Sequence, residues 1–197
     1  MSSRVGSMTG RPRDPAVDEA IRQATLDLVA EQGYRGVSME GIAARSGVSK
    51  QAVYRRFAGK GEVILDSLVA YARTRLPTPD TGDLGEDLLT LLEETFAAQR
   101  GVPGALNQAL AAEALQDPDF ARRVTDTLIQ SRRAAVGEIL DRARSRGQVT
   151  YPDNDVLIDL VFGPMWYALV FDATKLTDAY ATELSAAVTT LAASPPD

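Results

Sequence analysis

The chain has 197 residues, of which 45% are hydrophobic, so it is long enough to bury a sizeable core as one compact domain or two small ones. It has no cysteine and no histidine, which removes disulfides, thiolate nucleophiles and the commonest general base and metal ligand, so we expect no catalytic residue, no metal and no cofactor. The net charge of −6 argues against a nucleic-acid partner for the chain as a whole, and the absence of a long apolar run or a signal-peptide pattern predicts a cytoplasmic protein without a membrane partner.

The first helix is expected directly after a basic N-terminal arm. Residues 1–13 show no helical periodicity and carry three arginines among Ser, Gly and Pro, so we predict that they form a flexible arm. Apolar residues then recur at helical spacing, with Asp14 and Pro15 at the start and Gly33 at the end. The sequence therefore predicts an amphipathic helix over residues 14–32.

Helical patterns continue to the C-terminus, and no segment shows the alternation that is typical of a strand. Three helical stretches fall within residues 38–75, separated by Gly47 and by Ala58-Gly59. The proline-containing segment 76–82 cannot be helical and is predicted to be a connector. The predicted fold class is therefore all-α, with about nine helices. The remaining helices are expected at residues 83–100, 104–116, 118–146, 153–172 and 177–193.

Two helix starts of the same design lie between Val37 and Phe57. Ser38 and Ser49 each precede a helical stretch and can accept hydrogen bonds from its first amides, and the valine before each serine can pack on the helix that follows. Gly47 can adopt the positive φ that ends a helix, so the chain turns sharply and restarts within two residues. This pattern predicts a helix-turn-helix, for which the alternative is an ordinary αα-hairpin.

Steric fit and charge favour the helix-turn-helix. Ala43 is small where the two helices cross, and Val53 points from the second helix into the space between them. Residues 1–60 hold ten basic and six acidic residues, a net charge of +4, whereas the remainder of the chain has a net charge of −10. A basic segment is attracted to a phosphate backbone, and the acidic remainder resists lying on it. We therefore assign residues 14–60 to a DNA-binding domain.

The second helix of this unit has a basic face that carries no carboxylate. Burial of Val53 and Phe57 leaves its other side chains free to enter the major groove. For Tyr54 the alternative to a contact with DNA is that its side chain is half-buried and packs within the protein. We predict base contacts for Lys50, Gln51, Ala52 and Arg55. We predict phosphate contacts, which set register rather than sequence, for Ser38, Ser49, Tyr54, Arg56 and Lys60.

The stretch from Gly33 to Ile64 closely resembles the N-terminal domain of the tetracycline-repressor (TetR) family, and the match extends over about residues 14–72. In that family a first helix supports the helix-turn-helix, a fourth helix links it to a ligand domain, and a homodimer binds a palindromic operator. The resemblance implies phosphate contact for Tyr54 and Lys60 and core packing for Phe57. Ala58-Gly59 stands where Pro-Ser is frequent in the family, which affects the stiffness of the turn.

Residues 61–197 resemble the ligand-binding and dimerisation domain of the family in outline, through helix count and a helix containing Gly163-Pro-Met-Trp-Tyr167. The resemblance implies a dimer built from the last two long helices, through residues that could instead be intramolecular core: Leu157, Leu160, Val161, Leu184, Val188 and Leu191. The large side chains that could line a cavity, most of which could equally be core, are Phe96, Leu110, Phe120, Leu128, Phe162, Met165, Trp166 and Tyr167.

These observations predict a ligand-responsive regulator, a repressor, that binds double-stranded DNA as a homodimer and is released by a small, largely apolar effector. A ligand that tilts the helix from Lys60 to Arg75 would change the spacing of the two recognition helices, which must lie about one DNA turn (~34–36 Å) apart. Two other functions remain open: a DNA-binding protein without sequence preference, and a helical ligand-binding protein or enzyme without a DNA function.

Overall fold

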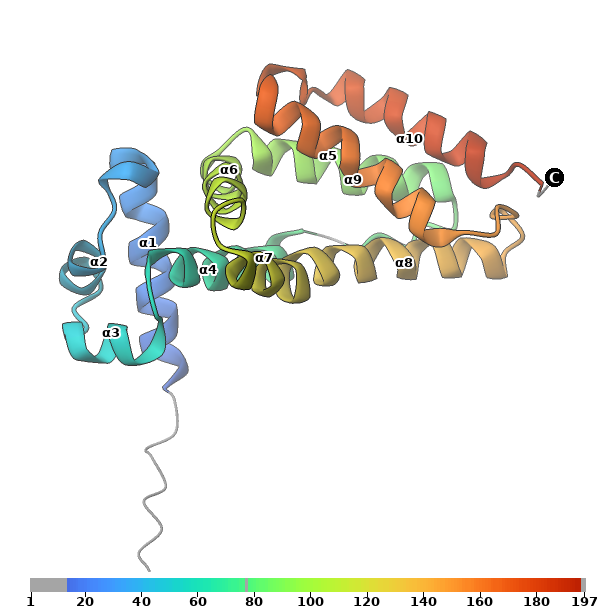
Figure 1. Cartoon of the computed structure of the whole chain (residues 1–197). Helices are drawn as coiled ribbons and strands as arrows, with labels where there is room; N and C mark the ends of the chain where they lie inside the picture. Colours follow the sequence, from blue (N-terminus) through green and yellow to red (C-terminus); the bar gives the residue numbers. More distant parts are fainter. Residues whose placement is uncertain (1–13, 77, 196–197) are drawn as a thin grey trace, which may run out of the picture.

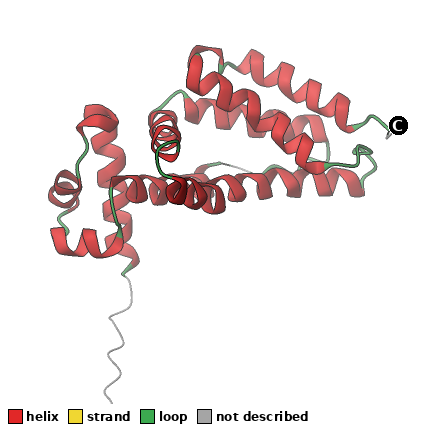
Figure 2. Ribbon diagram, viewed as in Figure 1, coloured by secondary structure: helices red, strands yellow, loops and turns green. Residues whose placement is uncertain are grey.

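The computed structural model describes residues 14–76 and 78–195, and within them the chain is helical with no strand (Figure 1, Figure 2). This confirms the all-α prediction, whereas the arm predicted over residues 1–13 lies outside the described residues. Because α7, a π-helical turn and α8 follow one another without a break, counting them as one gives nine helices in the described part of the chain, in agreement with the predicted number of about nine. The elements are α1 (Pro15–Gly36), α2 (Met39–Ser46), α3 (Lys50–Arg56), α4 (Lys60–Arg75), α5 (Leu84–Gln99), α6 (Val102–Ala114), α7 (Pro118–Val124), the π-helical turn η1 (Thr125–Ile129), α8 (Gln130–Ser145), α9 (Asn154–Phe171), the 3₁₀ turn η2 (Ala173–Lys175) and α10 (Asp178–Ala192).

Side chains cap the helices at the places where the sequence predicts their starts. Asp14 accepts a hydrogen bond from the Ala16 amide at 3.0 Å, and Pro15 occupies the first turn of α1, where its missing N–H costs nothing. Gly33 is non-helical, with φ 67° and ψ 169°, which confirms a break at the predicted end of this helix. One further helical turn follows the break, so α1 extends to Gly36.

The helices form two packed regions that α4 connects. In Figure 1, α1, α2 and α3 lie together at one end of the molecule, α9 and α10 lie at the other, and α4 runs from the first group toward α8. Contacts of α4 with α1, α6 and the π-helical turn hold it in this position. A displacement of α4 would therefore act directly on α1 and on both α6 and the π-helical turn.

Two apolar clusters make up the core. One joins α5, α8, α9 and α10. The other begins in α1–α4 and continues into α6, α7 and the π-helical turn through Leu106, Leu110, Phe120, Val124 and Leu128. The second cluster contains residues from both sides of the predicted domain boundary at residue 60. The division into residues 14–60 and 61–197 therefore does not separate two cores, and it stays a prediction about function.

The helix α9 departs from the expectation that no segment is long and apolar enough to cross a bilayer. The mean hydropathy over its 18 residues is 1.3, which is high enough for a membrane-spanning helix by length and composition, so the expectation is wrong. Asp155, Asp159 and Pro164 interrupt the apolar run but do not lower its mean hydropathy enough to exclude it. Only 33% of this helix is buried. The large apolar side chains that α9 leaves exposed are Val156, Leu160, Tyr167, Val170 and Phe171.

Candidate nucleic-acid interface and ligand cavity

The helices α2 and α3 form the helix-turn-helix that the sequence predicts. Ser38 Oγ accepts a hydrogen bond from the Gly41 amide at 3.0 Å, and Ser49 Oγ accepts one from the Ala52 amide at 3.3 Å. Between them Gly47 has φ 69° and ψ 13°, the left-handed conformation that favours glycine. Val53 is completely buried in the apolar cluster. The two serines thus act as caps, and their hydroxyl protons remain free to bond to a phosphate.

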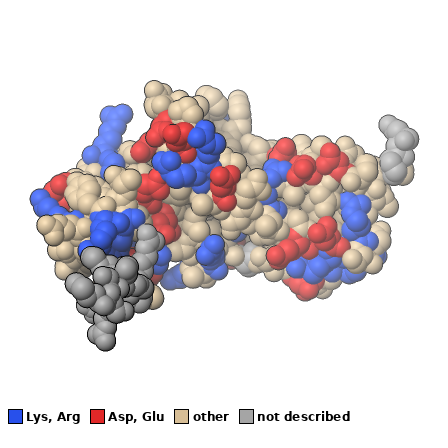
Figure 3. Space-filling view, turned by 60° about the horizontal axis from the view of Figure 1, so that its bottom comes forward, with Lys and Arg blue, Asp and Glu red and all other residues tan. Residues whose placement is uncertain are grey.

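The side chains predicted to read bases lie on the outer face of α3. Lys50, Gln51 and Arg55 are exposed and make no hydrogen bond or ion pair with any other described residue, whereas Ala52 is half-buried. In Figure 3, which brings the bottom of the Figure 1 view forward, basic side chains reach the surface at the end that carries α1–α3. Basic and acidic side chains are interspersed at the opposite end. The exposed Lys50 and Arg55 of α3 therefore contribute basic side chains to the surface of this end.

Tyr54 is held by a carboxylate of α2 that no pattern in the sequence indicates. Its hydroxyl donates a hydrogen bond to Glu40 Oε1 at 3.1 Å, and its side chain is 48% exposed. The bond raises the pKa of Tyr54, while the Glu40 backbone amide and the tyrosine hydroxyl lower the pKa of Glu40. Glu40 is therefore ionised at neutral pH beside the face of α3, where it repels phosphate and competes for the Tyr54 hydroxyl.

Arg56 pairs with Asp18 within the protein, so the phosphate contact predicted for it would require this ion pair to open. Its Nε lies 2.7 Å from Asp18 Oδ1 on α1, and its Nη1 donates to the Ala52 carbonyl at 3.2 Å. The side chains of Arg56 and Asp18 are only 10% and 17% exposed. The sequence could not reveal this because the partner lies 38 residues away on another helix. Arg56 fixes α3 against α1.

Lys60 lies at a junction of α1, α4 and α6. Its Nζ donates to the Tyr34 carbonyl at 3.2 Å and lies 3.9 Å from the centre of the Tyr34 ring. The Tyr34 hydroxyl donates to Glu113 on α6 at 2.7 Å, and burial together with this bond raises the pKa of Tyr34. Gly61 packs closely on Glu113, since a Cβ at this position would lie 2.6 Å from the carboxylate. Phosphate contact by Lys60 would require it to leave the Tyr34 carbonyl.

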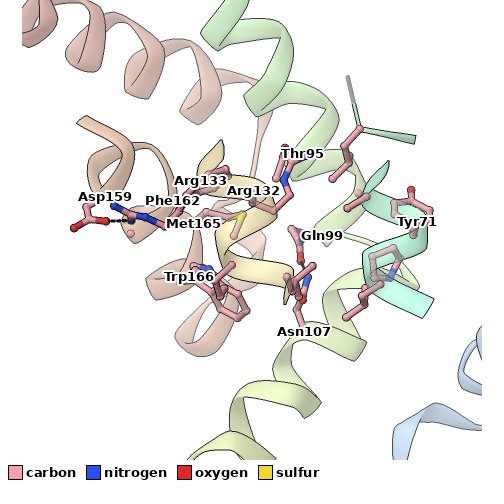
Figure 4. A pocket seen from close by; sticks show the side chains of 18 residues that line it. Tyr71, Thr95, Gln99, Asn107, Arg132, Arg133, Asp159, Phe162, Met165 and Trp166 are labelled. Atoms are coloured by element: carbon pink, nitrogen blue, oxygen red, sulfur yellow. Dashed lines mark hydrogen bonds and ion pairs between the residues drawn. The ribbon is translucent and has the colours of Figure 1, made fainter. Parts of the chain in front are cut away.

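A cavity of about 240 Å³ lies between α4, α5, α6, the π-helical turn, α8 and α9 (Figure 4). Figure 4 shows Thr95, Gln99, Asn107 and Arg132 together in the middle of the lining, with Phe162, Met165 and Trp166 on one side and Tyr71 on the other. The predicted lining residues Leu128, Phe162, Met165 and Trp166 are in place.

The other predicted lining residues lie elsewhere. Phe96 is fully buried in the cluster of α5, α8, α9 and α10, whereas Leu110 and Phe120 belong to the cluster around α4. Tyr167 is 64% exposed and lies against Phe171, with 5.1 Å between ring centres. Sequence reasoning selected large apolar side chains and missed the polar part of the lining. No pattern in the sequence identifies it, because amide side chains are usually exposed and only the packed helices show Gln99 and Asn107 to be buried.

The residues predicted to form a dimer interface are mostly core within one chain, the alternative that the sequence left open. Leu157, Val161, Leu184 and Val188 are buried in the cluster of α5, α8, α9 and α10, and Leu191 packs against it. Leu160 alone of the six is exposed, at 38%. Because α9 is apolar on several faces, periodicity does not distinguish the inner face of this helix from its outer one.

Two pairs of acidic residues that lie close in the sequence, Glu93 with Glu94 and Asp117 with Asp119, are at the surface or at a helix start. Glu93 and Glu94 are exposed on α5, and Asp117 caps α7 by accepting hydrogen bonds from the amides of Asp119 and Phe120. Within the described ranges, no three acidic side chains gather in a group that could hold a metal ion.

Comparison with known proteins decides the family. Residues 21–66 match the family model described as "Bacterial regulatory proteins, tetR family". Residues 78–188, more than half of the chain, match the family model described as "Tetracyclin repressor-like, C-terminal domain". The chain is also 32% identical over 179 residues to the HTH-type transcriptional regulator YdeS of Bacillus subtilis, with 90% of each chain covered. The chain belongs to the TetR family.

Further relatives agree with membership of the TetR family. The DNA-binding transcriptional repressor TetR of Mycobacteroides abscessus is 27% identical over 130 residues, which cover 66% of this chain and 68% of that protein. The crystal structure of the TetR family transcription regulator SCO0332 superposes with a TM-score of 0.79 at 29% identity, over 89% of this chain and 97% of that one. This TetR-family chain is a DNA-binding transcriptional regulator, which decides against a helical protein without a DNA function.

Proposed function

We propose that the protein is a cytoplasmic, homodimeric repressor without a catalytic role, which reads a palindromic operator through α3 and leaves it when a small molecule enters the cavity. The observation that carries the proposal is that α4 belongs to both sites. In the first half of α4, Asp66 accepts a hydrogen bond at 2.7 Å from Arg22 on α1 of the DNA-binding unit. The residues of α4 and its C-cap that line the cavity are Leu68, Tyr71, Ala72 and Leu76.

The cavity is placed so that a ligand can act on α4. Arg123 on α7 contacts Glu62 in the first turn of α4 at 2.5 Å, and the π-helical turn that follows α7 supplies Leu128 and Ile129 to the lining. Single π-helical turns within helices are frequent at functional sites. A ligand that displaces α4 would change the separation of two recognition helices, which must lie about one DNA turn (~34–36 Å) apart. Linkage then requires operator DNA to weaken ligand binding by the same factor.

The exposed face of α9 supports the proposed dimer. Tyr167, Val170 and Phe171 are 64%, 52% and 74% exposed at the end of this helix. Large apolar side chains gathered on one face usually mark a protein-protein contact. The exposed side chains of α10 that would allow a second helix to approach closely are small: Ala179, Ala186, Ala187 and Thr190. A second copy related by a two-fold axis would cover both faces and present two copies of α3 to DNA.

Light scattering and DNA stoichiometry test this proposal together. We expect the free protein to have twice the chain mass of 21.1 kDa and two chains to bind each palindromic site. Tyr167→Asp should give a folded monomer that binds operator weakly, because a charge on the covered face opposes association. Leu115→Asp is the matched control, since Leu115 is 83% exposed at the end of α6, and it should remain a dimer. A monomeric wild-type protein that still binds operator selectively would contradict the proposal.

A further inference from the structure

The polar part of the cavity contains groups that the protein leaves without partners. Among the described residues, five buried side-chain atoms lack a hydrogen-bond partner, and three of them, Thr95 Oγ1, Asn107 Oδ1 and an Arg132 guanidinium nitrogen, belong to lining residues of this cavity. The other two atoms, on Asp87 and Arg142, each lie within an ion pair, at 3.6 and 3.3 Å. Only the three cavity atoms therefore lack both a hydrogen bond and an ionic partner within the described part of the chain.

Arg132 is the unusual member of this group because it carries a charge. It forms no hydrogen bond or ion pair with any other described residue, and its aromatic neighbour is the Phe162 ring, 5.8 Å from the guanidinium carbon. Burial lowers the pKa of Arg132, and no acidic side chain contributes to the shift. A buried cation without a counter-charge is unfavourable, so such groups are normally paired.

The acidic side chain at the edge of the cavity does not supply the missing charge. Asp159 lines the cavity but forms an ion pair with Arg133, which also contacts Asp155 at 2.7 Å (Figure 4). Both carboxylates contact Arg133, whereas Arg132, the next residue along α8, lines the cavity and has no carboxylate in contact. Arg132 is therefore the cation of the lining that no carboxylate of the described residues contacts.

The neighbouring polar groups of Thr95 and Asn107 keep atoms that are free to form hydrogen bonds with a ligand. Asn107 is fixed because its side-chain amide donates to Gln99 Oε1 at 2.9 Å, which leaves Asn107 Oδ1 free to accept a hydrogen bond. Thr95 is 3% exposed and Asn107 is 6% exposed, so bulk water does not satisfy them. Thr95 can donate to an oxygen of a ligand, and Asn107 can accept from a hydroxyl or amide on the same ligand.

We propose that this cavity binds an organic acid, whose carboxylate pairs with Arg132 and Thr95 while its apolar body lies among Phe162, Met165 and Trp166. The inference deepens the proposed function, because it names the chemical class of the effector and rests on the cavity being the effector site. A cavity of ~150 Å³ accommodates benzene, so about 240 Å³ suits one ring with a short chain, or an aliphatic chain of similar size. The effector is then amphipathic instead of largely apolar.

Binding can be followed directly because Trp166 is the one tryptophan of the chain and lines the cavity. We would titrate the full-length protein with 4-phenylbutanoate and with its neutral analogue 4-phenylbutanamide, and repeat the pair with octanoate and octanamide. We expect the Trp166 fluorescence to change with each acid and each acid to bind about tenfold or more tightly than its amide, as a charge-assisted hydrogen bond requires. Equal affinity for acid and amide, or no binding of either acid, would overturn the proposal.

Variants of Arg132 separate a ligand contact from a structural role. Arg132→Met should abolish the preference for the acid, Arg132→Lys should retain part of it, and Arg122→Met, on the exposed face of α7, should leave it unchanged. Arg132→Met should also raise the melting temperature of the ligand-free protein, because it removes an unpaired buried charge; a fall would show that the arginine is needed for the fold and would overturn the proposal. Operator binding without ligand is measured separately, so loss of the acid preference does not bear on the regulator itself.

Discussion

The ion pair between Arg56 and Asp18 yields a prediction that distinguishes a structural role of this arginine from contact with DNA. The two side chains are 10% and 17% exposed with 2.7 Å between Nε and Oδ1, so the solvent screens them weakly. Asp18→Ala leaves the guanidinium without its carboxylate. Breaking a buried pair costs ~3–5 kcal/mol, and because this pair keeps some solvent contact we expect about 3 kcal/mol. At roughly 2–4 °C per kcal/mol for a chain of this size, the melting temperature should fall by ~6–12 °C.

Far-ultraviolet circular dichroism during heating measures this loss, and two further variants control it. Asp18→Ala combined with Arg56→Met should regain most of the lost stability, because removing both partners leaves no buried unpaired charge. Asp119→Ala removes a carboxylate whose side chain is 71% exposed, and it should change the free energy of unfolding by less than about 0.5 kcal/mol. A melting temperature of Asp18→Ala close to that of the wild type would refute the reasoning. Tighter operator binding by Asp18→Ala than by the double variant, which lacks Arg56, would show that the released Arg56 contacts phosphate, as the sequence alone suggests.

Three other predictions concern the interface and the packing of α6. Glu40→Gln should tighten operator binding a few-fold in a fluorescence titration, because it removes a negative charge beside the phosphates and weakens the acceptor that holds Tyr54. Arg55→Ala should cost roughly 1–3 kcal/mol of binding on the operator and much less on scrambled DNA. Gly104→Ala should destabilise the protein by about 3 kcal/mol in urea unfolding, because its Cβ would lie 1.8 Å from the Gln99 carbonyl oxygen. The matched variant Gly137→Ala, which meets no atom within 4 Å inside α8, should stabilise it by ~0.4–1 kcal/mol.

The sequence predicts those features that depend on neighbours along the chain. Helix starts at Ser38 and Ser49 and the turn at Gly47 follow from local hydrogen bonding and from backbone conformation, and the structure has all three. The boundaries of the C-terminal helices agree to within a few residues, because prolines, glycines and capping aspartates mark them. Local chemistry was therefore sufficient for the fold class and for the helix-turn-helix.

The remaining features depend on partners that are distant in the sequence. Asp18 lies 38 residues from Arg56, and Glu113 lies 79 residues from Tyr34, so no pattern in the sequence indicates either pair. The polar lining of the cavity comes from α5, α6 and α8 together, and the identity of its unpaired groups emerges only when the helices are packed. In α9 the apolar residues exceed what one face can hold, so composition could not assign them to the core, the cavity or the surface.

The most direct test of the central claim is fluorescence anisotropy of the full-length protein with the intergenic DNA beside its own gene, at a fixed physiological salt concentration, against a shuffled duplex of the same composition. A repressor that reads bases through α3 should prefer its site by ~10³-fold or more. Equal affinity for the two duplexes, falling steeply with salt, would contradict sequence-specific reading and favour contact with the phosphate backbone alone.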